Sequence, residues 1–194
     1  MENTKHKHFI LFKPYGYLSQ FVNNQTRRKN KKMLGELYNF PEKTMAIGRL
    51  DEHSEGLLLL TTDGQTSEFI RSAKVEKEYY AQVDGQISSE AIEKLKNGVE
   101  IGFEGTKYTT KKCKVSKIVE PAKLPERRKK IRDERHGPTS WISITLTEGK
   151  FRQVRKMTAA VGFPTLRLIR VRIGKIKLNQ MNVGEVIEVN NFLT

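Results

Sequence analysis

Apolar residues recur along the chain in short runs that predict more strands than helices. The runs at residues 9–12 and 57–62 are typical of buried strands, and the first stops at Pro14 and Gly16, which favour a turn. Similar patterns predict further strands over residues 44–47, 78–83, 108–119, 140–147, 166–176 and 185–189. The chain is therefore expected to be rich in strands.

Helical spacing is confined to a few segments. Residues 88–97 predict an amphipathic helix closed by Gly98, and residues 151–161 predict a second one, with shorter helices at 33–38 and 65–71. A charged segment with prolines at 121–137 predicts a mobile loop. No strand–helix–strand unit repeats, so we expect an α+β fold whose mixed, largely antiparallel central sheet has flanking helices and an active-site cleft.

The chain has 194 residues, which favours a single domain over 1–194, with two subdomains sharing one sheet as the alternative division. Cys113 is the only cysteine, which excludes an intramolecular disulfide and suits a reducing compartment. The first apolar run is too short for a signal peptide or a membrane anchor. We therefore expect a cytoplasmic monomer without membrane association.

Charge changes this picture more than length does. Lysine and arginine number 36 against 22 acidic residues, a net charge of +14 that predicts a polyanionic partner. The excess lies in three windows, at residues 22–32, 121–137 and 150–177, and the first and the last hold no acid. Solvated surface faces are the ordinary alternative, but together the windows favour contact with RNA phosphates. The candidate RNA-binding residues are Arg27, Arg28, Lys29, Arg127, Arg128, Lys129, Lys130, Arg152, Lys156 and Arg170.

Signals for bound cofactors and metals are missing. The sequence has no glycine-rich phosphate loop, and none of its four histidines stands at metal-ligand spacing from a carboxylate or from Cys113. We therefore expect neither a cofactor nor a metal.

The most informative local pattern is a polar loop between two apolar strands. Gly48 and Gly56 bound a segment that contains Arg49 and Asp51, and four consecutive leucines follow it. A rigid sheet that presents a polar loop is a common place for catalytic groups. The ordinary interpretation of Asp51 is a turn or cap residue, but the apolar strand beneath it favours a reactive carboxylate.

Five motifs in order resemble the RsuA/RluA-type pseudouridine synthases, over about 165 residues. The signature is Gly-Arg-Leu-Asp-x-x-Ser-x-Gly-Leu-Leu-Leu-Leu-Thr-x-Asp-Gly at residues 48–64. The others are Lys-Pro-Tyr-Gly at 13–16, Lys-Glu-Tyr at 77–79, Glu-Gly-Lys-Phe-Arg-Gln-Val-Arg-Lys-Met at 148–157 and Leu-Ile-Arg-Val-Arg-Ile-Gly at 168–174. Ser54 replaces the family's usual threonine and keeps the hydroxyl.

The resemblance implies a fold, a reaction and a site. It implies the pseudouridine synthase fold, without the N-terminal S4-like domain of many members, and isomerisation of a uridine in 23S rRNA without a cofactor. Asp51 would be the catalytic aspartate, either as the nucleophile or as the base, acting on a uridine flipped out of the RNA. The remaining active-site residues would be Arg49, Lys77, Tyr79, Arg155 and Leu168.

Each supporting residue also has a plain alternative. Arg155 would keep Asp51 ionised, since it lies at the edge of the apolar arc of the predicted helix beside Phe151, but it could be one more phosphate contact. Tyr79 would stack on the flipped uracil, but it could be a core aromatic. Arg49 would fill the gap left by the base or grip a phosphate.

Three other classes of protein compete with this interpretation. A non-catalytic rRNA-binding or ribosome-assembly protein would explain the charge equally well, but not the polar loop over an apolar strand. A DNA-binding protein would use residues 151–161 as a recognition helix, although no helix and turn precede them. A glycosidase would need two placed carboxylates and would gain nothing from a net charge of +14.

Overall fold

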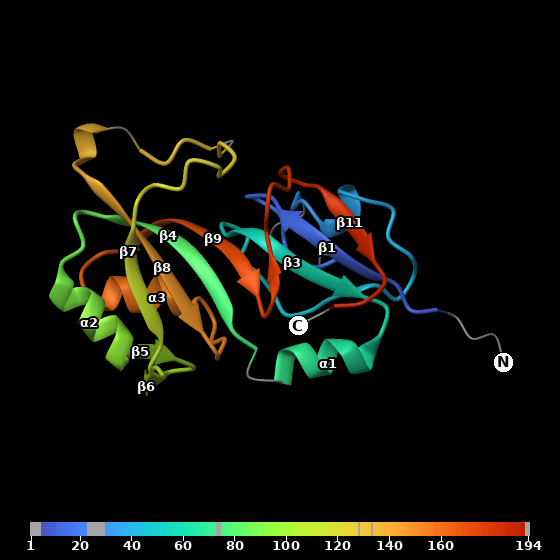
Figure 1. Cartoon of the computed structure of the whole chain (residues 1–194), viewed down its shortest axis with the longest axis horizontal. Coiled ribbons are helices and arrows are strands. Elements are labelled where there is room, and N and C mark those ends of the chain that lie inside the picture. Colours follow the sequence, from blue (N-terminus) through green and yellow to red (C-terminus); the bar gives the residue numbers. More distant parts are fainter. Residues whose placement is uncertain (1–4, 23–29, 73–74, 128, 133, 193–194) are drawn as a thin grey trace. The chain divides into compact units, whose positions relative to one another are not determined.

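The computed structural model describes residues 5–22, 30–72, 75–127, 129–132 and 134–192. It divides into two compact units (Figure 1). Unit 1 contains residues 1–75 and 170–194, and unit 2 contains residues 76–169. The strand pairs described below are all antiparallel, which confirms the predicted α+β class.

Unit 1 is built around a buried strand. Its regular elements are β1 (His8–Lys13), a 3₁₀ helix (Leu34–Glu36), β2 (Met45–Ala46), β3 (Glu55–Thr61), α1 (Gly64–Ser72), β10 (Ile176–Lys177) and β11 (Val186–Val189). β1 pairs with β3 on one side and with β11 on the other. Every residue of β3 is buried, and Leu58 and Leu60 pack with Phe9 and Leu11 of β1. β3 thus gives unit 1 a dry, rigid centre.

Unit 2 packs helices against one face of a sheet. Its elements are β4 (Lys77–Asp84), α2 (Ser89–Asn97), β5 (Glu100–Phe103), β6 (Thr106–Thr109), β7 (Lys114–Ile118), a 3₁₀ helix (Glu134–His136), β8 (Thr139–Leu146) and α3 (Gln153–Ala160). β8 pairs with β4 and β7. Ala81 and Ile142 of the sheet share a core with Leu95 of α2 and Met157 of α3. β9 (Thr165–Ile173) contributes residues to both units.

Most predicted elements are confirmed within a residue or two. The clearest case is α2, which begins after Ser88 and ends at Gly98 as predicted. The Ser88 hydroxyl accepts a hydrogen bond from the Ala91 backbone N–H at 3.2 Å, and Gly98 adopts a positive φ of 99°. The Ser88 cap satisfies a backbone N–H that the helix itself leaves unpaired, and Gly98 supplies the positive φ at which the helix ends.

Two predicted strands and one predicted short helix differ from the structure. The predicted strand 108–119 is two strands, β6 and β7, because Thr110 and Cys113 bond instead to Val99 and Lys96 at the end of α2. The predicted strand 166–176 turns at Gly174 and forms the β9–β10 pair. The short helix predicted at 33–38 is a single 3₁₀ turn.

The third helix starts later than predicted. Arg152 has the left-handed φ of 53°, so α3 begins at Gln153 and not at residue 151. Phe151 stands before the helix and is 65% exposed, so it does not extend the buried arc of Val154 and Met157. Among the residues that the structure describes, no helix is long and apolar enough to cross a membrane.

Candidate active site

The loop that carries Asp51, residues 47–54, connects β2 to β3. Asp51 is half-buried, and its carbonyl accepts a hydrogen bond from the Ser54 backbone N–H at 3.0 Å. Leu50 on one side is only 6% exposed, and Glu55 on the other is only 2% exposed. Both flanks of Asp51 are therefore anchored in the interior of unit 1.

A second segment, residues 13–19, holds this loop from the side, and we call it the strap. The Ser19 hydroxyl accepts a hydrogen bond from the Leu50 backbone N–H at 2.9 Å and donates to the Leu50 carbonyl at 2.8 Å. The Gly16 backbone N–H donates to the Glu52 carbonyl at 2.8 Å. The residues directly before and after Asp51 are thus both tied to the strap, which restricts where its carboxylate can go.

The strap begins with a fully buried lysine. Lys13 has no exposed surface, and its Nζ donates to the carbonyls of Pro14 at 2.8 Å and Tyr17 at 2.7 Å. Burial lowers the pKa of Lys13 to about 7, although the nearby carboxylates of Glu55 and Asp51 oppose this shift. A neutral amine has two N–H donors, which match the two carbonyls. Lys13 therefore fixes the curve of the strap in either charge state.

Polar and aromatic side chains form the surroundings of the loop. Arg49 is exposed, as a residue that contacts RNA should be. Glu52 forms an ion pair with Lys31 at 2.5 Å, and the rings of Tyr15 and His53 stack with centroids 5.2 Å apart. The stacked rings join the strap and the Asp51 loop a second time, through their side chains.

The other predicted active-site residues belong to unit 2. Leu168 is 5% exposed and lies in the core cluster with Val154, and Tyr79 is half-buried and packs against the same cluster. Lys77, at the start of β4, is half-buried. The structure thus gathers Tyr79 and Leu168 in one apolar cluster, and a stacking role for Tyr79 stays a prediction.

Arg155 lies on α3 and is half-buried, as the sequence predicts. Its Nη1 donates to the Thr165 carbonyl at 3.2 Å, which directs the guanidinium towards the β9 end of unit 2. Phe151 does not share its helix face, so the neighbour named in the prediction is wrong. Asp51 and Arg155 belong to different units, and their pairing stays a prediction.

A carboxylate network fixes the start of α3. Glu148 accepts hydrogen bonds from the Tyr108 hydroxyl at 2.5 Å, the Lys111 backbone N–H at 2.9 Å and Gln153 Nε2 at 2.5 Å. Burial opposes ionisation of Glu148, but these hydrogen bonds hold its pKa below the ordinary value. The network positions the turn before Arg155, and the sequence motif alone does not reveal it.

The predicted RNA-binding residues have different environments. Arg152, Lys129 and Lys130 are exposed, whereas half-buried Lys156 donates to the Gly102 carbonyl at 2.7 Å. Arg170 is only 3% exposed and its Nε donates to the Leu57 carbonyl at 2.7 Å, so this geometry does not support a surface contact with RNA. Arg27, Arg28, Lys29 and Arg128 lie outside the described residues. Half-buried Arg127 lines a cavity of unit 2.

Metal-binding and thiol chemistry gain no support from the described part of the chain. No group of three or more His, Cys, Asp or Glu residues there could hold a metal ion. The half-buried Cys113 thiol donates to the Leu95 carbonyl at 3.2 Å, and burial raises its pKa to about 11. A thiol with a raised pKa is a poor nucleophile at neutral pH.

The chain matches the model of a known protein family over most of its length. Residues 7–160 match the family described as RNA pseudouridylate synthase. The chain belongs to this family. The matched range includes the Asp51 loop, the strap and α3, so the synthase has each of these features within the family region.

Individual relatives agree with this assignment. Over 185 residues the synthase is 40% identical to ribosomal large subunit pseudouridine synthase E of Vibrio parahaemolyticus, covering 94% of this chain and 74% of that protein. It is 39% identical over 175 residues to the protein of the same name from Xanthomonas axonopodis, covering 89% of this chain and 88% of that protein. A solved crystal structure of a pseudouridylate synthase matches with a TM-score of 0.74 and 26% identity, covering 95% of this chain and 70% of that one.

Proposed function

We propose that this synthase converts a uridine of large-subunit (23S) ribosomal RNA to pseudouridine, with Asp51 as its catalytic carboxylate. The proposal rests above all on the anchoring of Asp51, whose two neighbours are both hydrogen-bonded to the strap. A reacting group must be held close to its productive geometry, and a loop meets this need only when other segments fix it.

The reaction defines what Asp51 must do. The N1–C1′ bond of uridine breaks, a C5–C1′ bond forms, C5 loses its hydrogen and N1 gains a proton. Asp51 either attacks C1′ or removes the 2′ proton, and both routes need an ionised carboxylate. No electron is gained or lost, so the overall isomerisation is redox-neutral.

We assign a part to each of the other residues. Arg155 supplies the positive charge that keeps Asp51 ionised, and Tyr79 stacks on the flipped uracil, beside the apolar surface of Leu168. Exposed Arg49 grips the adjacent phosphate or fills the gap that the base leaves. Lys77 lies two residues before Tyr79 and contributes positive charge near the RNA.

The RNA itself is held by basic residues around these groups. We propose phosphate contacts for Arg127, Lys129, Lys130, Arg152 and Lys156. Arg27, Arg28, Lys29 and Arg128 are proposed on charge alone. The names of the relatives in Vibrio and Xanthomonas favour large-subunit rRNA over other RNAs. We further propose that the protein acts as a monomer in the cytoplasm, where ribosomal RNA is made and modified.

The experiment that tests this function measures hydrogen release from C5. Transcripts of large-subunit rRNA, small-subunit rRNA and transfer RNA are prepared with tritium at C5 of uridine, and released tritium is counted. We expect release from the large-subunit transcript only. Tight binding of that transcript without release would favour the non-catalytic rRNA-binding protein, and equal release from transfer RNA would contradict the proposed substrate.

A further inference from the structure

Unit 2 contains a cavity of about 650 Å³ on the side of its sheet away from the helices, within the size range of small-ligand sites. Its walls come from β4, from β8, from Arg167 of β9 and from the long segment 119–138 that joins β7 to β8, which we call the β7–β8 loop. Figure 1 shows this loop extending beyond the ends of the two strands. The lining residues that bear on its chemistry are Gln82, Arg127, Lys129, Lys130, Arg132, Trp141 and Arg167.

Sheet register explains why the cavity lies on that side. Trp141 of β8 stands directly opposite Gln82 of β4 and Ile118 of β7, so the three side chains share one face. The next residue, Ile142, points to the other face, where α2 and α3 pack. The Trp141 face therefore takes its cover from the β7–β8 loop and not from a helix.

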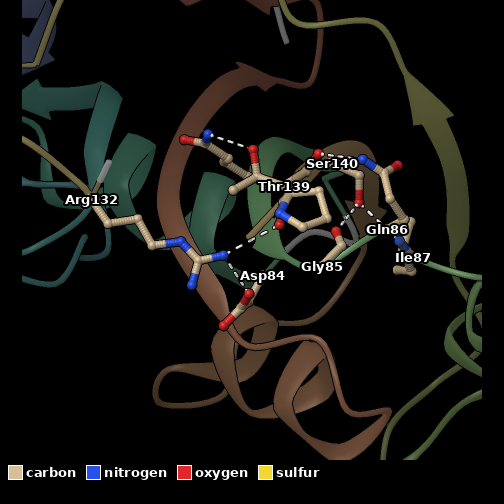
Figure 2. Close-up of polar contacts among 9 residues, drawn as sticks. Asp84, Gly85, Gln86, Ile87, Arg132, Thr139 and Ser140 are labelled. Carbon is tan, nitrogen blue, oxygen red and sulfur yellow. Dashed lines mark hydrogen bonds and ion pairs between the residues drawn. The ribbon is translucent and has the colours of Figure 1, made fainter. Parts of the chain in front are cut away.

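Arginine side chains hold the β7–β8 loop against unit 2. Arg127 Nη1 donates to the Leu166 carbonyl at 3.4 Å, and Arg167 Nη2 donates to the Pro125 carbonyl at 2.7 Å, so loop and β9 hold each other reciprocally. Figure 2 shows a further attachment, in which Arg132 pairs with Asp84 at 2.5 Å and also reaches the Pro138 carbonyl. The described part of the loop is thus attached to unit 2 through arginine side chains, and the mobility that the sequence predicts for it stays a prediction.

The chemistry of the walls suits a nucleotide. Five cationic side chains line the cavity against the two carboxylates of Glu120 and Glu126, and Asp84 neutralises Arg132, so a net positive charge remains that favours an anion. Trp141 is only 5% exposed, and its indole N–H has no hydrogen-bond partner among the described residues. A buried donor without an acceptor is costly, and a ligand oxygen would remove that cost. Cations beside an aromatic ring are the usual means of holding an unstacked base and its phosphate.

We propose that this cavity binds one unstacked nucleotide of the substrate RNA other than the uridine that is isomerised. The phosphate would lie among Lys129, Lys130 and Arg132, and the base would lie against Trp141. This proposal rests on RNA being the substrate, but it does not depend on Asp51. The RNA would then have a second contact with the synthase, and this contact would help to select the uridine that is isomerised.

Trp141 is the only tryptophan of the chain, so its fluorescence reports on this cavity alone. The probe is a single-stranded hexamer of uridines, titrated into the full chain. We expect a saturable fluorescence change for the wild type and an equal one for Asp51→Asn, which separates this test from the isomerisation. No fluorescence change on RNA binding would overturn the proposal, whatever the result for C5 tritium release.

A matched pair of double variants gives the residue-level test. Lys129→Ala/Lys130→Ala should weaken hexamer binding about tenfold and lower the slope of log affinity against log salt by about 0.7 for each phosphate that is no longer neutralised. Lys94→Ala/Lys96→Ala removes the same charge from α2, where Lys94 is exposed and Lys96 is half-buried, and should leave both values near the wild type. Equal weakening by the two double variants would show a general charge effect and overturn the proposal.

Two competitors separate RNA from other anions. Inorganic phosphate and hexaglutamate are each added at the phosphate or carboxylate concentration of the RNA hexamer. We expect neither to reproduce the Trp141 fluorescence change. An equal change with phosphate would mean a free-anion site, and an equal change with hexaglutamate would mean an acidic protein partner. Either result would overturn the nucleotide assignment.

Discussion

The Asp51 loop and the β7–β8 loop are both polar segments next to a sheet, but they are held in opposite ways. Backbone groups and a buried hydroxyl fix the Asp51 loop, and the strand that follows it is wholly buried. Charged side chains of Arg127, Arg132 and Arg167 fix the β7–β8 loop. Short, buried hydrogen bonds hold a reacting group in a fixed position. Arginine side chains suit an RNA-binding surface, because they can also donate hydrogen bonds to phosphates. We therefore propose that the first loop carries the chemistry and that the second loop attaches the RNA.

Removing the reacting carboxylate should have the largest effect. Asp51→Asn should lower single-turnover tritium release by at least about a thousandfold, because the amide can neither attack C1′ nor take a proton. RNA affinity and melting temperature should stay near the wild type. Glu52→Gln is the matched control, since it neutralises the adjacent carboxylate and breaks its ion pair with Lys31, and it should cost about fivefold at most. Similar losses in the two variants would remove Asp51 from its assigned role.

Arg155 and Arg152 should behave differently, although they lie only three residues apart at the start of α3. Arg155→Ala should lower the single-turnover rate at saturating RNA about a hundredfold, because Asp51 loses the cation assigned to it. Arg152→Ala should instead weaken RNA binding and lower its salt dependence. Equal losses of the saturated rate and equal salt slopes would show that both arginines are phosphate contacts.

The strap can be tested through Ser19. Ser19→Ala leaves the N–H and the carbonyl of Leu50 without their buried partner, which should lower the free energy of unfolding by about 1–3 kcal/mol. Turnover should fall about tenfold, since the Asp51 loop loses one of its two backbone attachments to the strap. Ser19→Thr keeps the hydroxyl and should recover activity more than stability. A variant that is destabilised but fully active would show that the strap does not position Asp51.

Lys13 predicts a smaller effect that depends on pH. Its pKa is about 7 in the folded chain against an ordinary value of 10.5, so the unfolded chain binds the extra proton between these values. Stability should therefore rise with pH from about 7 to 10.5, by at most about 1.4 kcal/mol per unit, and the destabilising contribution is fully present below pH 7. Urea titrations of Lys13→Met should lack this rise. An identical pH dependence in the variant and the wild type would place the titration elsewhere.

Local signals in the sequence are enough to predict many elements. Ser88 and Gly98 mark the ends of α2, and the leucines after Gly56 mark β3, because caps and buried runs act within a few residues. The β5–β6 hairpin is not predicted in full, since residues 100–103 are half polar and carry no strong strand signal. The segment 110–113 resembles a strand in sequence, but its bonds to the end of α2 depend on tertiary structure.

In the candidate site, too, residues in local motifs can be predicted from the sequence, whereas residues that act through distant contacts cannot. The motif around Asp51 reveals that residue, but nothing local reveals Ser19, because the contact that gives it a role lies 31 residues away. The prediction of Arg170 as an RNA contact fails because charge in a sequence does not say which side chains turn inward. Nothing in the sequence indicates that Trp141 lines a cationic cavity, since the register of β4, β7 and β8 creates that neighbourhood.

The most direct test of separate roles for the Asp51 loop and the β7–β8 loop is single-turnover isomerisation of a large-subunit rRNA fragment, measured over a range of enzyme and salt concentrations. For Lys129→Ala/Lys130→Ala we expect a half-saturating enzyme concentration about tenfold above the wild type, with a shallower salt dependence. The rate constant at saturation should stay within about twofold of the wild type, because these lysines do not touch the ribose. If the saturated rate falls towards that of Asp51→Asn while the half-saturating concentration is unchanged, the β7–β8 loop takes part in the chemistry and the separation of roles is wrong.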